Sequence, residues 1–198
     1  MIDITLSLTL LFLLNPLASV PLLIQAYKNK FNVKLIAMKA VILAFVVALS
    51  FVIFGPLLFE IYNVNVDSFR AGGGILILLL GISMARQTDK EIEKGGSDTL
   101  ISIIATPLLT GPATLSYLII TTAERGILVA LTNLLLAFIM VAIIFFTFAI
   151  LIPRINMKYV NFLSRLLGLF VLALGIQMTV KGIMGLVIPD LQNILKPN

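Results

Sequence analysis

The chain has 198 residues, of which 60% are hydrophobic and 12% are charged, and its mean hydropathy is +1.14. Soluble domains carry about 25% charged residues, so this composition excludes a water-soluble globular fold. The net charge of +5 does not indicate nucleic acid binding, because the basic residues lie at the ends of long uncharged runs. Cysteine and histidine are both absent, which excludes disulfides, thiolate and imidazole chemistry and the usual soft-metal sites. We therefore predict neither a metal nor a cofactor.

Charge-free runs predict six transmembrane helices, since a spanning helix needs about 20 mainly apolar residues. The predicted helices cover residues 4–27, 36–60, 68–86, 99–122, 126–152 and 163–188. No basic segment precedes the first run and no small-residue cleavage site follows it, so we interpret it as a retained helix rather than a signal peptide. The predicted fold class is an all-α membrane protein.

The loops predict the orientation of these helices. The segments after the first, third and fifth helices hold ten of the 14 Lys and Arg residues, and the opposite side holds four. Under the positive-inside rule the first group lies in the cytoplasm. Both termini are therefore predicted to lie outside.

Two internal similarities predict that residues 1–91 and 92–198 are related three-helix repeats. Two prolines in the first helix align with two in the fourth at a single offset of 91 residues. The third and sixth helices share an Arg near the start and a Gly-Ile-x-Met end, at offsets of 95 and 94 residues. Because each half has three spans, the second half enters the membrane from the opposite side and the repeat is inverted. Inverted repeats with interrupted helices are typical of secondary transporters.

The prolines predict that the first and fourth helices are broken near the bilayer midplane. A proline inside a helix lacks its own N–H and crowds the carbonyl four residues earlier. The predicted helix-break residues are Pro16, Pro21, Pro107 and Pro112. The carbonyls expected to be freed are those of Phe12, Leu17, Ile103 and Leu108. Irregular backbone at this depth is tolerated where it is buried in protein or lines a hydrated cavity; a simple kink is the alternative for each proline on its own.

A broken helix offers both signs of partial charge without an ionised side chain. The N-terminus of the second half-helix suits a carboxylate, and the C-terminal carbonyls of the first half-helix suit an ammonium group or a cation. Neutral groups complete the candidate substrate site: Asn15, Ser19, Thr106, Thr110 and Gly111. A small zwitterion such as an amino acid fits this set. A strongly charged substrate fits poorly, because no ionised side chain is predicted at that depth.

Further polar and small residues lie within the spans. Asn133 and Gln177 either line the site or bridge helices. Glycines in the third and sixth helices are expected to allow close helix packing. These are Gly72, Gly73, Gly74, Gly81, Gly168 and Gly175.

Four of these segments resemble the MarC family over essentially the whole chain. They are the proline segment of the first helix, the Ala-Gly-Gly-Gly start of the third, Thr-Pro-Leu-Leu-Thr-Gly-Pro in the fourth and Gly-Ile-Gln-Met in the sixth. The resemblance implies a multi-pass protein of the cell (inner) membrane that moves glycine, alanine, serine and similar amino acids. The commonest family form of the first motif has Gly where this chain has Ala18, and the extra methyl is expected to narrow the site.

We therefore predict a secondary transporter of small neutral amino acids that works by alternating access around the proline motifs. The alternatives are an exporter of another small metabolite or ion, and a non-transporting membrane accessory protein. An enzyme is disfavoured, because intramembrane hydrolysis needs a nucleophile with a base, paired aspartates or metal ligands. Apart from the lipid bilayer and the small-molecule substrate, no partner is predicted. The coupling ion (Na⁺ or H⁺), the direction of transport and the oligomeric state stay open at this point.

Overall fold

The computed structural model describes residues 2–86, 97, 101, 104 and 109–195, and these residues form helices and short connections. The helices are α1 (Ile4–Leu14), α2 (Val20–Lys28), α3 (Val33–Tyr62), α4 (Val66–Arg86), α6 (Pro112–Arg125), α7 (Ile127–Leu151) and α8 (Met157–Leu195). Two short 3₁₀ helices join them, η1 (Pro16–Ser19) and η3 (Ile152–Arg154).

Five helical segments are long and apolar enough to cross a bilayer. They are Ile4–Lys28, Val33–Leu57, Val66–Arg86, Ile127–Arg154 and Lys158–Ile188. The predicted fourth span, 99–122, is represented by the 14-residue helix α6, because most of its first half lies outside the described residues. The predicted link 87–98 also lies almost entirely outside them.

The last helix is longer than predicted. α8 runs over 39 residues, Met157–Leu195, whereas the sequence predicts residues 163–188. The residues added at its start include Lys158, which a search for uncharged runs excludes, whereas Arg165 lies within the predicted range. Long basic side chains extend toward the headgroups while their stems stay against apolar surface, so a helix can continue through them.

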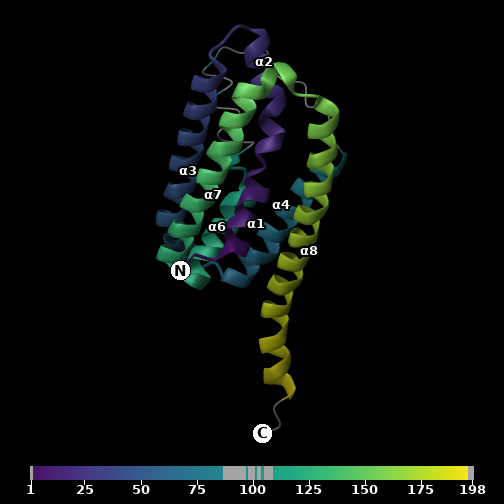
Figure 1. The fold of residues 1–198 in the computed structure, drawn as a ribbon. Helices are drawn as coiled ribbons and strands as arrows, with labels where there is room; N and C mark the ends of the chain where they lie inside the picture. Colours follow the sequence, from purple (N-terminus) through teal and green to yellow (C-terminus); the bar gives the residue numbers. More distant parts are fainter. Residues whose placement is uncertain (1, 87–96, 98–100, 102–103, 105–108, 196–198) are drawn as a thin grey trace.

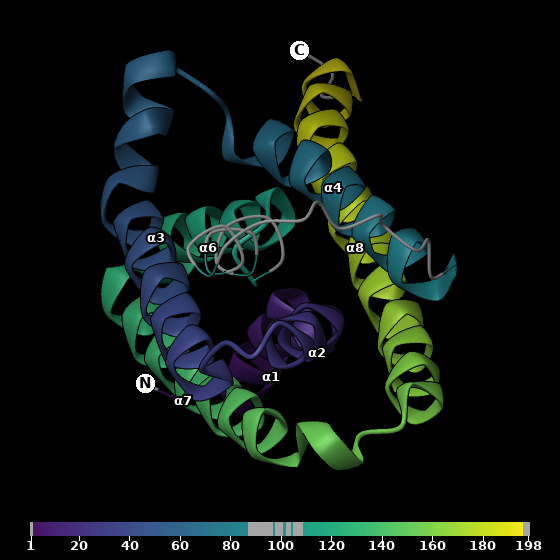
Figure 2. The same ribbon diagram turned by 90° about the horizontal axis from the view of Figure 1, so that it is seen from above.

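The helices form three groups, which Figures 1 and 2 show from two directions. α3 and α7 lie together on one side, and α4 and α8 pair on the other. The interrupted first span (α1, η1, α2) and α6 lie between these two pairs. Pro16, Leu109 and Thr110 are buried there, and Pro21 and Gly111 are half-buried, whereas Pro112 at the start of α6 is exposed.

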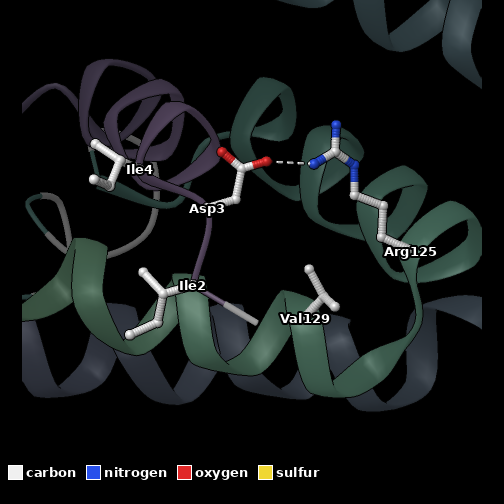
Figure 3. A pocket seen from close by; sticks show the side chains of 5 residues that line it. All are labelled: Ile2, Asp3, Ile4, Arg125 and Val129. Atoms are coloured by element: carbon white, nitrogen blue, oxygen red, sulfur yellow. Dashed lines mark hydrogen bonds and ion pairs between the residues drawn. The ribbon is translucent and has the colours of Figure 1, made fainter.

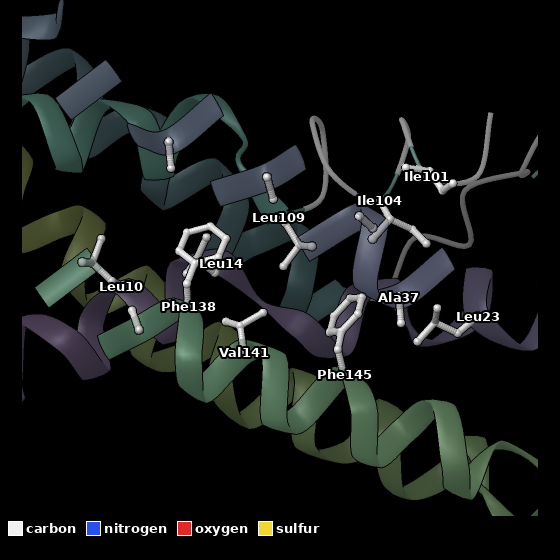
Figure 4. Packing of buried hydrophobic residues seen from close by; sticks show 14 of the residues in the cluster. Leu10, Leu14, Leu23, Ala37, Ile101, Ile104, Leu109, Phe138, Val141 and Phe145 are labelled. Atoms are coloured by element: carbon white, nitrogen blue, oxygen red, sulfur yellow. The ribbon is translucent and has the colours of Figure 1, made fainter. Parts of the chain in front are cut away.

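The larger apolar core joins α3 and α7 to the central helices. Four alanines recur on one face of α3 and are fully buried: Ala37, Ala40, Ala44 and Ala48. Small side chains let helix backbones approach closely, and α7 packs Phe138 and Phe145 into the same core. Figure 4 shows Leu14 and Leu109, which precede the two proline-started helical segments, within this cluster.

Glycines form the contact between α4 and α8. A Cβ atom at Gly74 would lie 2.4 Å from the backbone nitrogen of Thr179, and one at Gly175 would lie 2.4 Å from that of Leu78. Backbone atoms occupy the same space at Gly81, Gly168 and Gly182. No side chain fits at these positions without moving a helix, which explains the glycines by close packing.

Gly72 does not belong to this contact, and Gly73 approaches α8 only at a side chain. Nothing lies within 4 Å of a Cβ at Gly72, so the expectation that it mediates close packing is wrong. A Cβ at Gly73 would lie 2.9 Å from the Ser116 side chain of α6 and 3.1 Å from the Met178 side chain of α8. The run of three glycines thus faces three directions, since successive helix residues are about 100° apart, as 3.6 residues per turn require.

Candidate functional site

The first span is interrupted at Asn15. This residue has a left-handed backbone (φ 43°, ψ 64°) and ends α1, and its N–H donates to the Leu11 carbonyl at 3.2 Å. Asparagine tolerates this conformation better than most residues. Pro16 then begins η1 and Pro21 lies in the first turn of α2, where the missing proline N–H has no intrahelical partner to lose. The prolines therefore start new helical segments rather than kinking a continuous one.

One predicted consequence of this break is wrong. The Leu17 carbonyl was expected to be freed by Pro21, but it accepts a hydrogen bond from the Val20 N–H. The tighter 3₁₀ winding of η1 supplies this donor one residue before the proline. The carbonyls of Ile103 and Leu108 lie outside the described residues.

The described part of the fourth span begins at a helix N-terminus. Gly111, in extended conformation, precedes α6, and Pro112 is its first residue. The Gly111 carbonyl accepts from the Leu115 N–H at 3.1 Å, whereas the N–H groups of Ala113 and Thr114 have no acceptor within the helix. Thr106 and Pro107 lie outside the described residues.

The end of α1 and the start of α6 meet. The Thr114 hydroxyl donates to the Leu13 carbonyl at 3.3 Å, and both groups are buried. The partly negative C-terminus of one helix therefore lies beside the partly positive N-terminus of the other. The predicted combination of backbone acceptors and donors occurs here between two different spans.

Two buried oxygens at this break have no hydrogen-bond partner among the described residues. They are Asn15 Oδ1 and Ser19 Oγ, in side chains that are 2% and 0% exposed. Both residues precede a helical segment, and neither side chain caps it. An unsatisfied buried polar group costs about 1–3 kcal/mol. Such a cost is common at functional sites.

Among the described residues, the buried polar side chains belong to the first, fourth and fifth spans. They are Ser7, Thr9, Asn15, Ser19, Thr110, Thr114, Ser116, Thr121, Thr122 and Asn133. Several hydroxyls bond to the carbonyl four residues earlier, as Thr9 does to Thr5 and Thr122 to Leu118. Sequence reasoning missed six of this set, because serine and threonine satisfy themselves in any membrane helix and carry no distinctive spacing.

Of the remaining predicted residues, Gln177 and Asn133 lie on other helices than the break. Gln177 is exposed on α8. Asn133 is fully buried on α7, where its Oδ1 accepts from the Asp3 N–H and the Ser7 hydroxyl, each at 2.8 Å. Asn133 therefore joins α7 to the start of α1. Thr110 is buried just before Gly111.

Replacing Asn133 by alanine is expected to destabilise the fold by about 1–3 kcal/mol, because a partly buried N–H and a buried hydroxyl lose their acceptor. Thermal unfolding in detergent measures this change. Thr132→Ala is the control, since this exposed hydroxyl bonds only to carbonyls of its own helix. Equal unfolding temperatures for the two variants would contradict the role given to Asn133.

Ion pairs join α6 to the start of α1 and to α4 at the end of the bundle that holds the N-terminus (Figure 1). Arg125 at the end of α6 pairs with Asp3 at 2.6 Å, and both line a pocket (Figure 3). Arg70 of α4 pairs with Asp67 and with Glu124. Hydrogen bonding from the Leu6 N–H and from Arg125 lowers the pKa of Asp3 below its ordinary value. Asp3 is therefore ionised at neutral pH.

The fold and this buried polar break define a multi-pass helical integral membrane protein. The model of the MarC family of integral membrane proteins matches residues 2–187. The chain belongs to this family, which confirms the resemblance drawn from its motifs.

Curated relatives support this assignment over nearly the full length. A UPF0056 membrane protein of Methanocaldococcus jannaschii is 30% identical over 188 residues, covering 87% of this chain and 91% of that protein. Another from Pyrococcus horikoshii is 28% identical over 196 residues, covering 92% of this chain and 93% of that protein. The YvbG protein of Bacillus subtilis is 25% identical over 189 residues, covering 87% and 89%. No solved structure matches the chain.

Proposed function

We propose that this protein is a secondary transporter of small neutral amino acids of the glycine, alanine and serine type. The substrate site lies at the break in the first span, against the start of α6. Asn15, Ser19, Thr106, Thr110 and Gly111 contribute to it, and Pro16, Pro21, Pro107 and Pro112 set the breaks. The protein acts in the cell (inner) membrane with both termini outside.

The observation that carries this proposal is the pair of unpartnered oxygens. Asn15 Oδ1 only accepts hydrogen bonds, so the group that satisfies it must be a donor or a cation. An ammonium group meets this requirement, and the terminal carbonyls of α1 add further acceptors. The N–H groups of Ala113 and Thr114, which have no acceptor within α6, suit the carboxylate of the same molecule. A zwitterion thus finds both partners across one helix–helix contact.

The neutrality of the site favours a substrate without net charge. The buried polar side chains among the described residues are all Ser, Thr or Asn, and none is Asp, Glu, Lys or Arg. An ion with net charge would enter this environment without a counter-ion and would lose much of its solvation free energy. A small amino acid carries both charges, and each is met by partial charges of the helix ends.

Alternating access requires two structural units that move relative to each other, and we assign this role to the two predicted three-helix repeats. The contact between α4 and α8 supports this inverted repeat. A Cβ at Gly81 would lie 2.5 Å from the Leu172 nitrogen, and one at Gly175 would lie 2.4 Å from the Leu78 nitrogen. The two contacts correspond under an offset of 94 residues. Gly81 of the first half corresponds to Gly175 of the second, and Leu172 of the second half corresponds to Leu78 of the first. This correspondence is expected of two halves related by a pseudo-two-fold axis.

The proposal is tested with purified protein reconstituted in liposomes. Labelled glycine, alanine and serine are offered, with Na⁺ and H⁺ gradients imposed separately. Saturable uptake above that of protein-free liposomes is expected, and the gradient that drives it identifies the coupling ion. Folded protein that moves none of the three under any gradient would overturn the proposal and would favour another small substrate or an accessory role.

A further inference from the structure

The pocket at the N-terminal end of the bundle is separate from the break. It has a volume of about 530 Å³ and is lined by Ile2, Asp3, Ile4, Arg125 and Val129. α1 connects it to Asn15 over 11 residues, which corresponds to about 16 Å at about 1.5 Å per residue. Figure 3 shows Asp3 and Arg125 directed toward each other across the pocket, with the apolar side chains around them.

The charges of this pocket form a matched set for a zwitterion. A carboxylate and a guanidinium lie 2.6 Å apart, and three aliphatic side chains surround them. Arg binds carboxylates with charge-assisted hydrogen bonds, in bidentate geometry where access allows. The Asp carboxylate binds an ammonium group in the same way, and the aliphatic side chains suit a hydrogen or methyl on the α-carbon.

The Asp3–Arg125 pair is also suited to exchange. Both side chains are partly exposed, 36% and 53% respectively, and an ion pair between partly exposed groups contributes little to stability. A substrate that supplies a carboxylate to Arg125 and an ammonium to Asp3 replaces one ion pair by two. The pair links the start of α1 to the end of α6, so separating it removes one of the contacts between the two helices whose other ends meet at the break.

We propose that this pocket binds the ammonium and carboxylate groups of an α-amino acid before it reaches the break, and that binding opens the Asp3–Arg125 link. The inference rests on the proposed transport of amino acids. It adds a second site, on the path from the N-terminal end of the bundle, and assigns recognition of both charged groups to Asp3 and Arg125.

Site-directed labelling tests this site without relying on transport. The chain has no cysteine, so Val129→Cys gives a single thiol in the pocket, which reacts with a membrane-impermeant maleimide in reconstituted full-length protein. Glycine and alanine are expected to slow this reaction at least about threefold at saturation. Alaninamide, which lacks the carboxylate, and propionate, which lacks the ammonium, are expected to leave the rate unchanged.

A neighbouring ion pair supplies the matched control. Glu124 precedes Arg125 and pairs with Arg70, but neither residue lines the pocket. Adding Arg125→Gln or Asp3→Asn to Val129→Cys should raise the alanine concentration that gives half-maximal protection roughly tenfold or more, the loss expected for a hydrogen bond to a charged group. Adding Glu124→Gln should change it less than about twofold, and Arg125→Lys should keep part of it.

The outcomes separate this inference from the proposed function. Equal protection by alanine and its two analogues, or protection that survives Arg125→Gln, would overturn the pocket as an amino acid site. If the wild type takes up alanine but alanine does not protect the thiol of Val129→Cys, the pocket is not an amino acid site and the proposed transport still stands. Specific protection without uptake would support the pocket and count against transport.

Discussion

Alanine at Gly74 is expected to destabilise the protein by about 2–3 kcal/mol or more, because overpacking a tight contact costs about 1–3 kcal/mol and a backbone neighbour cannot rotate away. The new Cβ would lie 2.4 Å from the Thr179 nitrogen. Either α4 and α8 separate along their whole glycine contact or the helices distort locally. Thermal unfolding in detergent and uptake in liposomes should both decline.

Gly72→Ala is the control for this prediction. The residue lies two positions away on the same helix, is exposed, and has open space where its Cβ would lie. Stability should be unchanged or rise by up to about 1 kcal/mol, the gain in helix propensity from Gly to Ala. Similar losses in both variants would show that glycine flexibility, rather than the close α4–α8 contact, is the property that matters.

Replacing Ser19 by alanine is expected to leave the fold as stable as the wild type, or more stable by up to about 1 kcal/mol, and to weaken substrate binding about tenfold. The hydroxyl is buried, caps no helix and has no hydrogen-bond partner among the described residues. Removing it therefore breaks no hydrogen bond within the part of the chain that the structure describes. It takes away one acceptor for the substrate ammonium, so the KM for alanine uptake should rise.

A capping residue that is in use provides the comparison. Asn32 precedes α3 and accepts from the Leu35 N–H at 3.1 Å, so Asn32→Ala should lose about 1 kcal/mol with unchanged KM. The opposite signs of the two stability changes follow from the hydrogen bonds alone. A Ser19→Ala variant that unfolds more easily and keeps its KM would mean that the hydroxyl is structural.

The sequence predicted the helical membrane class and the first break, because each depends on local chemistry. Uncharged runs of bilayer length define the spans, and two prolines in one run interrupt it. The break lies at Asn15, because asparagine adopts the left-handed backbone that ends α1 before Pro16. The same reasoning failed for Leu17, since the donor that satisfies it comes from 3₁₀ winding rather than from an α-helix.

Features that depend on the rotation of helices about their axes were not predictable. Whether Gly72 or Gly74 faces α8 is decided by packing, and both occur in one run of glycines. The contact of Thr114 with Leu13 joins residues about a hundred positions apart. The Asp3–Arg125 ion pair was likewise not predictable, because both residues lie at span ends, where charged residues are common.

The central claim is that the interrupted first span binds a small neutral amino acid, and two asparagines allow a direct test. Asn15 and Asn63 both have left-handed backbones (φ 43° and 49°), so glycine replaces either without backbone strain. Asn63 ends α3 and is exposed. Uptake of labelled alanine by liposomes is measured for the wild type, Asn15→Gly and Asn63→Gly. We expect saturable uptake by the wild type and Asn63→Gly, and a KM raised about tenfold in Asn15→Gly, since one hydrogen bond to the ammonium is lost. The same KM in all three proteins, or no uptake by any of them, would contradict the claim.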